Sequence, residues 1–131
     1  MASSLVKKLG IQPGQRVLVV TAPAGYVELL TDRAEGVTVA TFGEDPFDFV
    51  HLFVKHSAEY ADLSPIAFGA VTYDGLLWIS YPKKSSNVET DLTRDVLWRL
   101  TADTGLRAVT QVSINSVWSA MRFRPSEKVG K

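Results

Sequence analysis

The chain has 131 residues, of which 46% are hydrophobic and 21% charged, and its 14 basic and 14 acidic residues give a formal net charge of zero. This composition is typical of one globular domain, and the neutral balance argues against nucleic-acid binding and electrostatic attachment to a membrane. There is no cysteine, and His51 and His56 are the only histidines. Disulfides and thiolate chemistry are therefore excluded, and no metal site is expected. No apolar run is long enough for a signal peptide or a membrane span, so a cytoplasmic location is expected.

Short apolar runs separated by turn residues predict strands. The run VLVV in Arg16 to Val20 is apolar on both faces, as a central parallel strand requires. Asp74-Gly75 is expected to turn the chain into another such run, and Asn115-Ser116 to form a tight hairpin turn. The predicted strands are 16–20, 37–42, 47–54, 75–81, 106–114 and 117–123.

Capping residues and apolar spacing place helices between most of these strands. Ser3 or Ser4 caps a first short helix, which Gly10 ends. Proline is tolerated only in a first helical turn, so Ser64-Pro65 is expected to break the helix that Ser57 caps. The predicted helices are a short one before residue 10, then 25–31, 57–64, 65–70, and one that Thr90 or Asp91 caps and Gly105 ends.

Alternation of strands and helices with apolar strands predicts an α/β fold, a parallel sheet covered on both faces. The last two strands are joined by a short turn and must be antiparallel. We therefore expect a single domain over 1–131, with a disordered tail at 126–131. The sheet should be a Rossmann-like three-layer sandwich of six mostly parallel strands with a C-terminal antiparallel hairpin.

In this order of elements the chain resembles the class I, S-adenosylmethionine-dependent methyltransferases. Leu9 to Val20 is similar to their helix end, Pro-Gly turn and first strand, and Phe47-Asp48 to the Phe-Asp that often opens their fourth strand. Residues 74–80 are similar to the fifth strand and 104–107 to the approach to the sixth. The resemblance implies the strand order 2-1-4-5-7-6 in that family's strand names. The chain also resembles small bacterial proteins of unknown function that begin with LGIxPGQ.

The cofactor loop departs from that family's pattern of acidic-x-Gly-x-Gly-x-Gly. Val19 stands at the acidic position, Thr21 at the first glycine and Pro23 at the middle glycine, so that only Gly25 remains. Proline supplies no amide hydrogen and adds a ring where the backbone must approach the cofactor. The end of the second strand also lacks the family's acidic residue, with Glu44 and Asp45 two or three residues further on, and the third strand is missing. We therefore expect no bound cofactor, and the resemblance leaves S-adenosylmethionine as the alternative.

Ligands of open α/β sheets bind beyond the carboxyl ends of the strands, where the strand order reverses. The residues expected at that rim, and therefore predicted to bind a ligand, are Thr21, Gly25, Tyr26, Tyr81, Lys83, Lys84, Ser85 and Ser86. Two lysines and two serine hydroxyls on one loop can hold a phosphate or carboxylate. The favoured alternative is a solvated loop that keeps the fold soluble. Tyr26 either lines the crevice or packs the first helix on the sheet.

Each histidine has a different expected role. His56 lies at a strand-to-helix junction on the rim and is the candidate general acid or base, or else an exposed residue at a helix start. His51 lies in the middle of a strand and is expected to be a core histidine with a hydrogen-bond partner. One exposed tryptophan beside an edge strand would suit a homodimer.

Three functions remain open at this point. The lost glycines favour a non-catalytic methyltransferase-like domain that binds a small anionic ligand or a partner. A small S-adenosylmethionine-dependent methyltransferase with an atypical loop is the first alternative, and an enzyme that uses Lys83, Lys84 and His56 on a small anionic substrate is the second. The fold alone does not choose among them, because function depends on the site.

Overall fold

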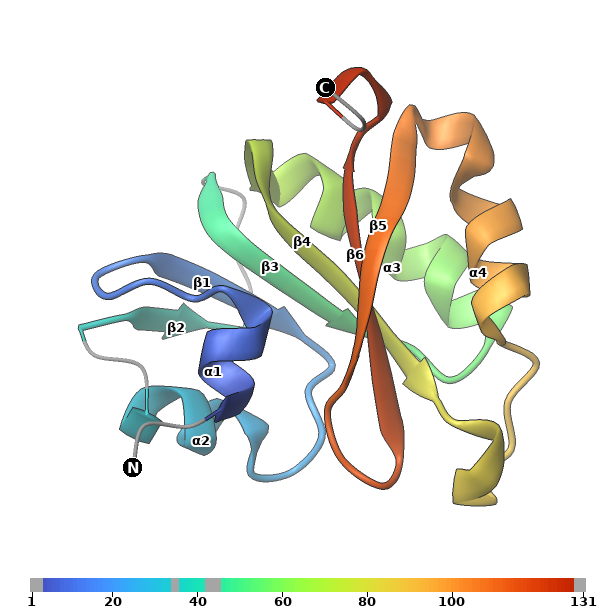
Figure 1. The fold of residues 1–131 in the computed structure, drawn as a ribbon, viewed down its shortest axis with the longest axis horizontal. Coiled ribbons are helices and arrows are strands. Elements are labelled where there is room, and N and C mark those ends of the chain that lie inside the picture. The colour runs from blue at the N-terminus through green and yellow to red at the C-terminus, as the bar shows by residue number, and fades with distance from the viewer. Residues whose placement is uncertain (1–3, 34–35, 42–45, 129–131) are drawn as a thin grey trace.

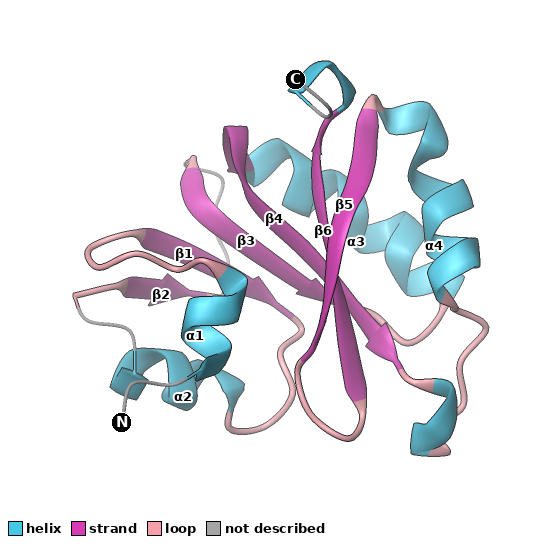
Figure 2. Cartoon of the chain, in the orientation of Figure 1, coloured by secondary structure: helices cyan, strands magenta, loops and turns pink. Residues whose placement is uncertain are grey.

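The computed structural model describes residues 4–33, 36–41 and 46–128. They form one six-stranded sheet with helices on both faces (Figures 1 and 2). The strands are β1 (Arg16–Val20), β2 (Thr38–Ala40), β3 (Phe47–Phe53), β4 (Val71–Pro82), β5 (Leu106–Ser113) and β6 (Trp118–Pro125). The α-helices are α1 (Ser4–Leu9), α2 (Tyr26–Arg33), α3 (Ser57–Ala70) and α4 (Arg94–Thr101). Three 3-10 turns complete the described elements: η1 (Lys84–Ser86), η2 (Ala102–Thr104) and η3 (Ser126–Lys128).

The strand order β2-β1-β3-β4-β6-β5 confirms the predicted sheet. β1 pairs in parallel with β2 and with β3, and β3 pairs in parallel with β4. Only β6 runs the other way, since it is antiparallel to both of its neighbours. The chain thus passes from β1 outward to β2 and then back across β1 to β3. The order of the strands reverses between β1 and β3, and a crevice opens beyond the carboxyl ends of strands at such a point.

The sheet divides the core into two layers. On one face α1 and α2 pack through Leu9, Tyr26 and Leu30, and on the other α3 and α4 pack through residues that include Ala67 and Leu97 (Figure 1). Side chains of β1 alternate between the two layers, which explains why its whole VLVV run is buried. Each such side chain contributes roughly 1.5–3 kcal/mol when it is fully buried. Nε1 of Trp78 in β4 also donates to the carbonyl of Leu9 at 3.0 Å and so ties α1 to the centre of the sheet.

The predicted break at Ser64-Pro65 is wrong, because α3 continues through both residues. Tyr60, Ser64 and Ala67 are buried at helical spacing on either side of Pro65, so one continuous stripe packs against the sheet. This packing offsets the roughly 3 kcal/mol that an interior proline costs. The helix also begins one residue differently from the prediction, with His56 in the capping position and Ser57 as the first helical residue.

The predicted turn at Asp74-Gly75 is also wrong, because β4 begins at Val71 and passes through both residues. The register of β4 against β3 is irregular there, and Asp74 has a positive φ of 57°. The Asp74 carboxylate accepts two hydrogen bonds from Arg124 of β6, at 2.9 and 2.8 Å. A bulge fastened by this ion pair therefore replaces the expected turn.

Smaller differences concern the ends of elements. α4 starts at Arg94 with Thr93 as its cap, whereas Thr90 or Asp91 was predicted. β2 is shorter than predicted, and its expected last residue lies outside the described residues, as do Glu44 and Asp45. The hairpin between β5 and β6 is confirmed, but its connection takes up residues 114–117 and is not a two-residue turn.

A chain of three polar groups crosses the core beside the first strand. The ring of His51 in β3 is fully buried; its Nδ1 lies 2.6 Å from the Tyr26 hydroxyl and its Nε2 lies 2.6 Å from Oγ of Ser80 in β4. His51 is thus the core histidine that was predicted. Burial lowers the pKa of His51 to about 3 and raises the pKa of Tyr26, so both groups are neutral at pH 7. The hydrogen bonds join α2 to two neighbouring strands.

Substitution of Gly75 tests the bulge. A Cβ at position 75 would lie 2.5 Å from Oγ1 of Thr72 and 2.9 Å from Cγ2 of Val71, so Gly75→Ala should lower the free energy of unfolding by about 1–3 kcal/mol. Gly69 in α3 is the matched control, since no atom lies within 4 Å of where a Cβ would be added. Gly69→Ala should be stabilising by about 0.5–1 kcal/mol. Urea unfolding measures both, and equal stability of the two variants would contradict the crowding at the bulge.

The buried histidine predicts a pH dependence of stability. In the unfolded chain His51 takes up a proton near its ordinary pKa of 6.5, whereas in the folded chain it stays neutral down to about pH 3. The free energy of unfolding should therefore decrease by about 1.4 kcal/mol for each pH unit below that ordinary value and level off above it. Urea unfolding between about pH 5 and 7.5 measures this slope, away from the range in which carboxylates titrate. In His51→Gln, which cannot titrate, the pH dependence of the free energy of unfolding should be weaker by that amount. An unchanged slope would show that His51 does not cause the pH dependence.

Candidate functional site

A cavity of about 440 Å³ lies at the switch point between β1 and β3. We call it the switch-point crevice. Its walls come from the loop after β1, the end of β3 with the start of α3, the loop after η1, and the start of β6. The lining residues are Thr21, Ala22, Pro23, Ala24, Phe53, Lys55, Glu59, Val88, Val117 and Trp118.

Thr21 bridges the two strands at the mouth of this crevice. Its Oγ1 lies within hydrogen-bond distance of the Val20 carbonyl and of the Phe53 carbonyl at the end of β3. Its φ is 55°, a left-handed conformation that is unusual for a β-branched residue. The backbone thus takes a path that favours glycine, while the side chain occupies the gap that a glycine would leave open.

The rest of the loop after β1 places little hydrogen-bonding capacity in the crevice. Pro23 lines it without an amide hydrogen. Gly25 has a φ of 87° and no atom within 4 Å of where a Cβ would lie, so its backbone remains accessible. Tyr26, for which two roles were open, packs in the core with its hydroxyl on His51.

The crevice has an aromatic wall and an engaged carboxylate. The rings of Phe53 and Trp118 meet edge to face with centroids 5.2 Å apart. Oε1 of Glu59 accepts hydrogen bonds from the backbone amides of Lys55 at 2.7 Å and His56 at 3.3 Å. Because Glu59 caps its own helix in this way, it is poorly placed to act as a free base.

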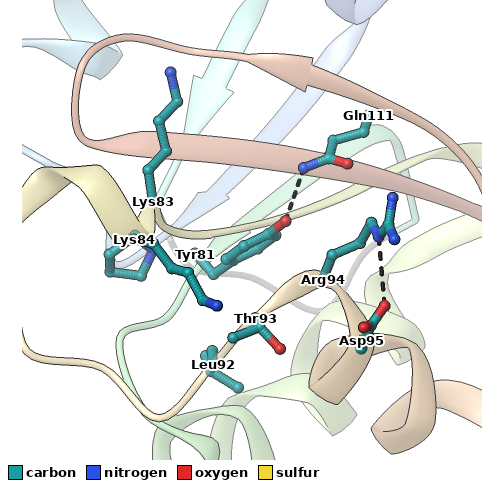
Figure 3. A pocket seen from close by; sticks show the side chains of 9 residues that line it. Tyr81, Lys83, Lys84, Leu92, Thr93, Arg94, Asp95 and Gln111 are labelled. Atoms are coloured by element: carbon teal, nitrogen blue, oxygen red, sulfur yellow. Dashed lines mark hydrogen bonds and ion pairs between the residues drawn. The ribbon is translucent and has the colours of Figure 1, made fainter.

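A second cavity, of about 350 Å³, lies beyond the end of β4 (Figure 3). We call it the basic pocket. It is lined by Tyr81, Pro82, Lys83, Lys84, Leu92, Thr93, Arg94, Asp95 and Gln111. Tyr81, Lys83 and Lys84 were predicted as ligand-binding residues, and the structure brings them together with Arg94 of α4 and Gln111 of β5.

The two lysines differ in orientation. The Lys83 ammonium donates to Oγ of Ser113 at 2.6 Å, near the β5–β6 hairpin. Lys84 extends in a different direction, toward Thr93 and the start of α4 (Figure 3). Arg94 lines the pocket from α4, and its Nε lies 3.5 Å from Oδ1 of Asp95 in an exposed ion pair. Lys84 and Arg94 are thus cations of two separate elements that line one pocket.

Neutral polar groups complete the basic pocket. Nε2 of Gln111 donates to the Tyr81 hydroxyl and to Oγ of Ser119, both at 2.8 Å. Burial raises the pKa of Tyr81, so its hydroxyl keeps its proton at neutral pH. The pocket thus combines two cations with a hydroxyl and an amide, a set that suits an anion bearing hydrogen-bonding oxygens.

The two predicted serines lie apart from the lining residues. The Ser86 hydroxyl donates to the Lys83 carbonyl at 2.6 Å and accepts from the amide of Val88 at 3.2 Å, so it stabilises the η1 turn. Ser85 is exposed on the same turn. Neither lines the basic pocket or the switch-point crevice.

His56 lies near the loop between β4 and α4, which contributes residues to both cavities. The Asp91 carboxylate accepts one hydrogen bond from the backbone amide of Ser57 at 2.8 Å and another from the Ser57 hydroxyl at 2.5 Å. The Thr90 hydroxyl donates to the Lys55 carbonyl. Nδ1 of His56 lies 3.9 Å from Oδ1 of Asp91. The hydrogen bond from the Ser57 hydroxyl lowers the pKa of Asp91. These contacts assign His56 and Asp91 to anchoring the loop, since His56 lines neither cavity.

In the part of the chain that the structure describes, no three histidine, aspartate or glutamate side chains gather closely enough to hold a metal ion. No helix among the same residues combines the length and the apolar composition that crossing a membrane requires.

Sequence reasoning missed Arg94, Gln111 and Trp118 as cavity residues. Arg94 follows a predicted helix cap and had a visible signal, a cation close in sequence to the lysine loop. Gln111 and Trp118 carried none, because their positions depend on the register of β5 and β6.

Comparison with known proteins supports the fold alone. No family model matches the chain, and no curated protein matches its sequence. Among solved structures it is similar to an S-adenosylmethionine-dependent methyltransferase from Aquifex aeolicus, with a TM-score of 0.62, 15% identity, and coverage of 92% of this chain and 87% of that one. It is also similar to a ribosomal protein L11 methylase from Lactobacillus delbrueckii subsp. bulgaricus, with a TM-score of 0.59, 10% identity, and coverage of 93% and 75%.

A third similar structure is one chain of a Haloferax volcanii complex that contains the methyltransferase activator Trm112. The TM-score is 0.61 at 13% identity, and the match covers 93% of this chain and 88% of that one. At such low identities the likeness concerns the backbone and not the site. Together with the strand order, these matches show that the chain has a class I methyltransferase-like fold.

Proposed function

We propose that this chain is a non-catalytic binding domain on a methyltransferase-like fold, and that it takes a small anionic ligand in the basic pocket. The observation that carries the proposal is that Lys84 and Arg94 face one cavity at the carboxyl end of β4, beside the neutral hydroxyl of Tyr81. Charge-assisted hydrogen bonds from lysine and arginine are the usual means of holding phosphates and carboxylates.

The geometry of the switch-point crevice disfavours a cofactor bound against the loop after β1, which is the usual mode for this fold. Thr21 joins the ends of β1 and β3 where a close backbone approach would be needed, and Pro23 offers no donor. A dinucleotide or nucleoside cofactor depends on backbone amides at this turn. In this loop the amide of position 23 is missing, and the Thr21 hydroxyl is turned toward protein carbonyls.

An S-adenosylmethionine-dependent methyltransferase with an atypical loop is the second candidate. Two observations favour it: the crevice measures about 440 Å³, and the backbone at Gly25 is unobstructed. The solved structures that share the fold include enzymes that use this cofactor. The further alternative, acid–base catalysis by His56 on an anion, is disfavoured because His56 does not line the basic pocket.

A homodimer is a separate proposal that concerns the surface. Trp98 on α4 is 48% exposed and lines a shallow cavity together with Arg107 and Ala108 of the edge strand β5. An exposed tryptophan beside an unpaired strand edge is a feature that a second copy would cover. Sedimentation of the purified chain measures its oligomeric state.

The proposal predicts different responses to two classes of ligand. S-adenosylmethionine and its demethylated product should leave the melting temperature unchanged at about 1 mM, whereas inorganic phosphate and simple organic anions should raise it. Titration calorimetry measures the affinity, and the fluorescence of Trp118, which lines the crevice, reports local occupancy. The matched control is Trp118→Phe, which removes this signal and leaves the basic pocket intact. Binding of S-adenosylmethionine at about 10 µM or tighter would replace the proposal with the methyltransferase alternative.

A further inference from the structure

We propose that the occupant of the basic pocket is a small organic phosphomonoester. Its phosphate lies between Lys84 and Arg94, and its organic part lies against Tyr81, Pro82 and Leu92. This inference rests on the proposed function, which requires only some anion at this place. It adds the charge of the ligand, the residues that hold it, and the need for an organic group.

The charge of the ligand follows from the charges around the pocket. Lys83, Lys84 and Arg94 bring three positive charges, and Asp95 brings the one negative charge among the lining residues. A net charge of plus two is matched by a phosphomonoester, which carries about −1.5 to −2 charges at neutral pH, better than by a single carboxylate. Lys83 contributes at longer range, because its ammonium is held by Ser113.

The geometry assigns the closest contacts to Lys84 and Arg94. They come from separate elements, η1 and α4, and both line the pocket: the Lys84 ammonium lies over Leu92 and Thr93, and the Arg94 guanidinium lies on the side of Gln111 (Figure 3). Both side chains are exposed, so each can turn onto a ligand without disturbing the core. Arginine adds a planar pair of donors that fits two phosphate oxygens at once, and lysine adds a point charge.

The size and lining of the pocket require more than a bare phosphate. A volume of about 350 Å³ lies in the range of cavities that hold small organic ligands. Apolar atoms of Pro82 and of the Tyr81 ring line the pocket, and the Tyr81 hydroxyl lies beside the Gln111 amide (Figure 3). An organic group there replaces water over apolar side chains, which inorganic phosphate cannot do.

Asp95 should compete with the ligand. Its carboxylate lies 3.5 Å from the Arg94 side chain, and both groups are largely exposed. A bound phosphate must displace this carboxylate from the Arg94 guanidinium, and the carboxylate also repels the phosphate. Removing the negative charge should therefore tighten binding.

The test uses phenyl phosphate, inorganic phosphate and phenol as probes, each titrated into the whole chain by calorimetry at matched ionic strength. Phenyl phosphate should bind with a dissociation constant below about 1 mM, at least about tenfold tighter than inorganic phosphate, and phenol should not bind. Lys84→Gln and Arg94→Gln should each weaken phenyl phosphate about tenfold or more, since each loses a charged hydrogen bond. Asp95→Asn should tighten it by about threefold.

Arg99→Gln is the matched control. Arg99 is an exposed cation on the same helix as Arg94 and does not line the pocket, so its loss should change the affinity less than about threefold. Circular dichroism and unliganded melting temperatures check that the exposed substitutions leave the fold intact. The inference is overturned if the dissociation constant of phenyl phosphate exceeds about 1 mM, if inorganic phosphate binds equally well, or if Arg99→Gln weakens binding as much as the other two substitutions.

The same titrations separate this inference from the proposed function. If a carboxylate or sulfate raises the melting temperature through Lys84 while phenyl phosphate does not bind, the phosphomonoester is wrong and the anion-binding domain stands. If no anion binds and S-adenosylmethionine does, both proposals fail together.

Discussion

Parallel pairing of β1 with β3, buried on both faces, is the constraint on which the rest of this structure depends. Val17 to Val20 pair residue by residue with 49–52 of β3, and their side chains alternate between the two core layers. A strand in this position needs helices on both sides, which α2 and α3 supply. It also brings the carboxyl ends of β1, β3 and β4 to one edge of the sheet. Both cavities lie at that edge.

The hydrogen-bonded group around His51 fixes β3 relative to β4 and to α2. Tyr26 comes from α2, His51 from β3 and Ser80 from β4, so one chain of polar contacts spans three elements inside an apolar layer. A buried polar group without a partner costs about 1–3 kcal/mol, and so the alternative registers of these strands are disfavoured. His51 thus has the structural role in the core that the sequence predicted for it. Its low pKa follows from burial and does not indicate acid–base chemistry.

The fold was predictable where local patterns and tertiary packing agree. The run VLVV specifies a buried strand, and the hairpin specifies the antiparallel end of the sheet. The starts of helices were harder, because distant groups compete for capping residues. Asp91 was expected to cap α4, but its carboxylate is taken by Ser57, which lies 34 residues away in sequence, and Thr93 caps the helix in its place. The helix break predicted at Pro65 was wrong for a similar reason, since the packing of Tyr60 and Ala67 stabilises the helix on both sides of the proline.

The candidate site was also predictable only in part. The loop with Lys83 and Lys84 follows β4 as expected, because the end of a central strand is visible in the sequence, but neither lysine lines the switch-point crevice. That Lys84 and Arg94 line the same pocket was not predicted, because it depends on how Asp91 and Thr90 anchor the loop to Ser57 and Lys55. The same anchors matter for both cavities. Val88 of the loop lines the switch-point crevice while Lys84 lines the basic pocket, so one rigidly anchored segment serves both cavities. The hydrogen bonds of Asp91 and Thr90 therefore help to position part of the wall of each cavity.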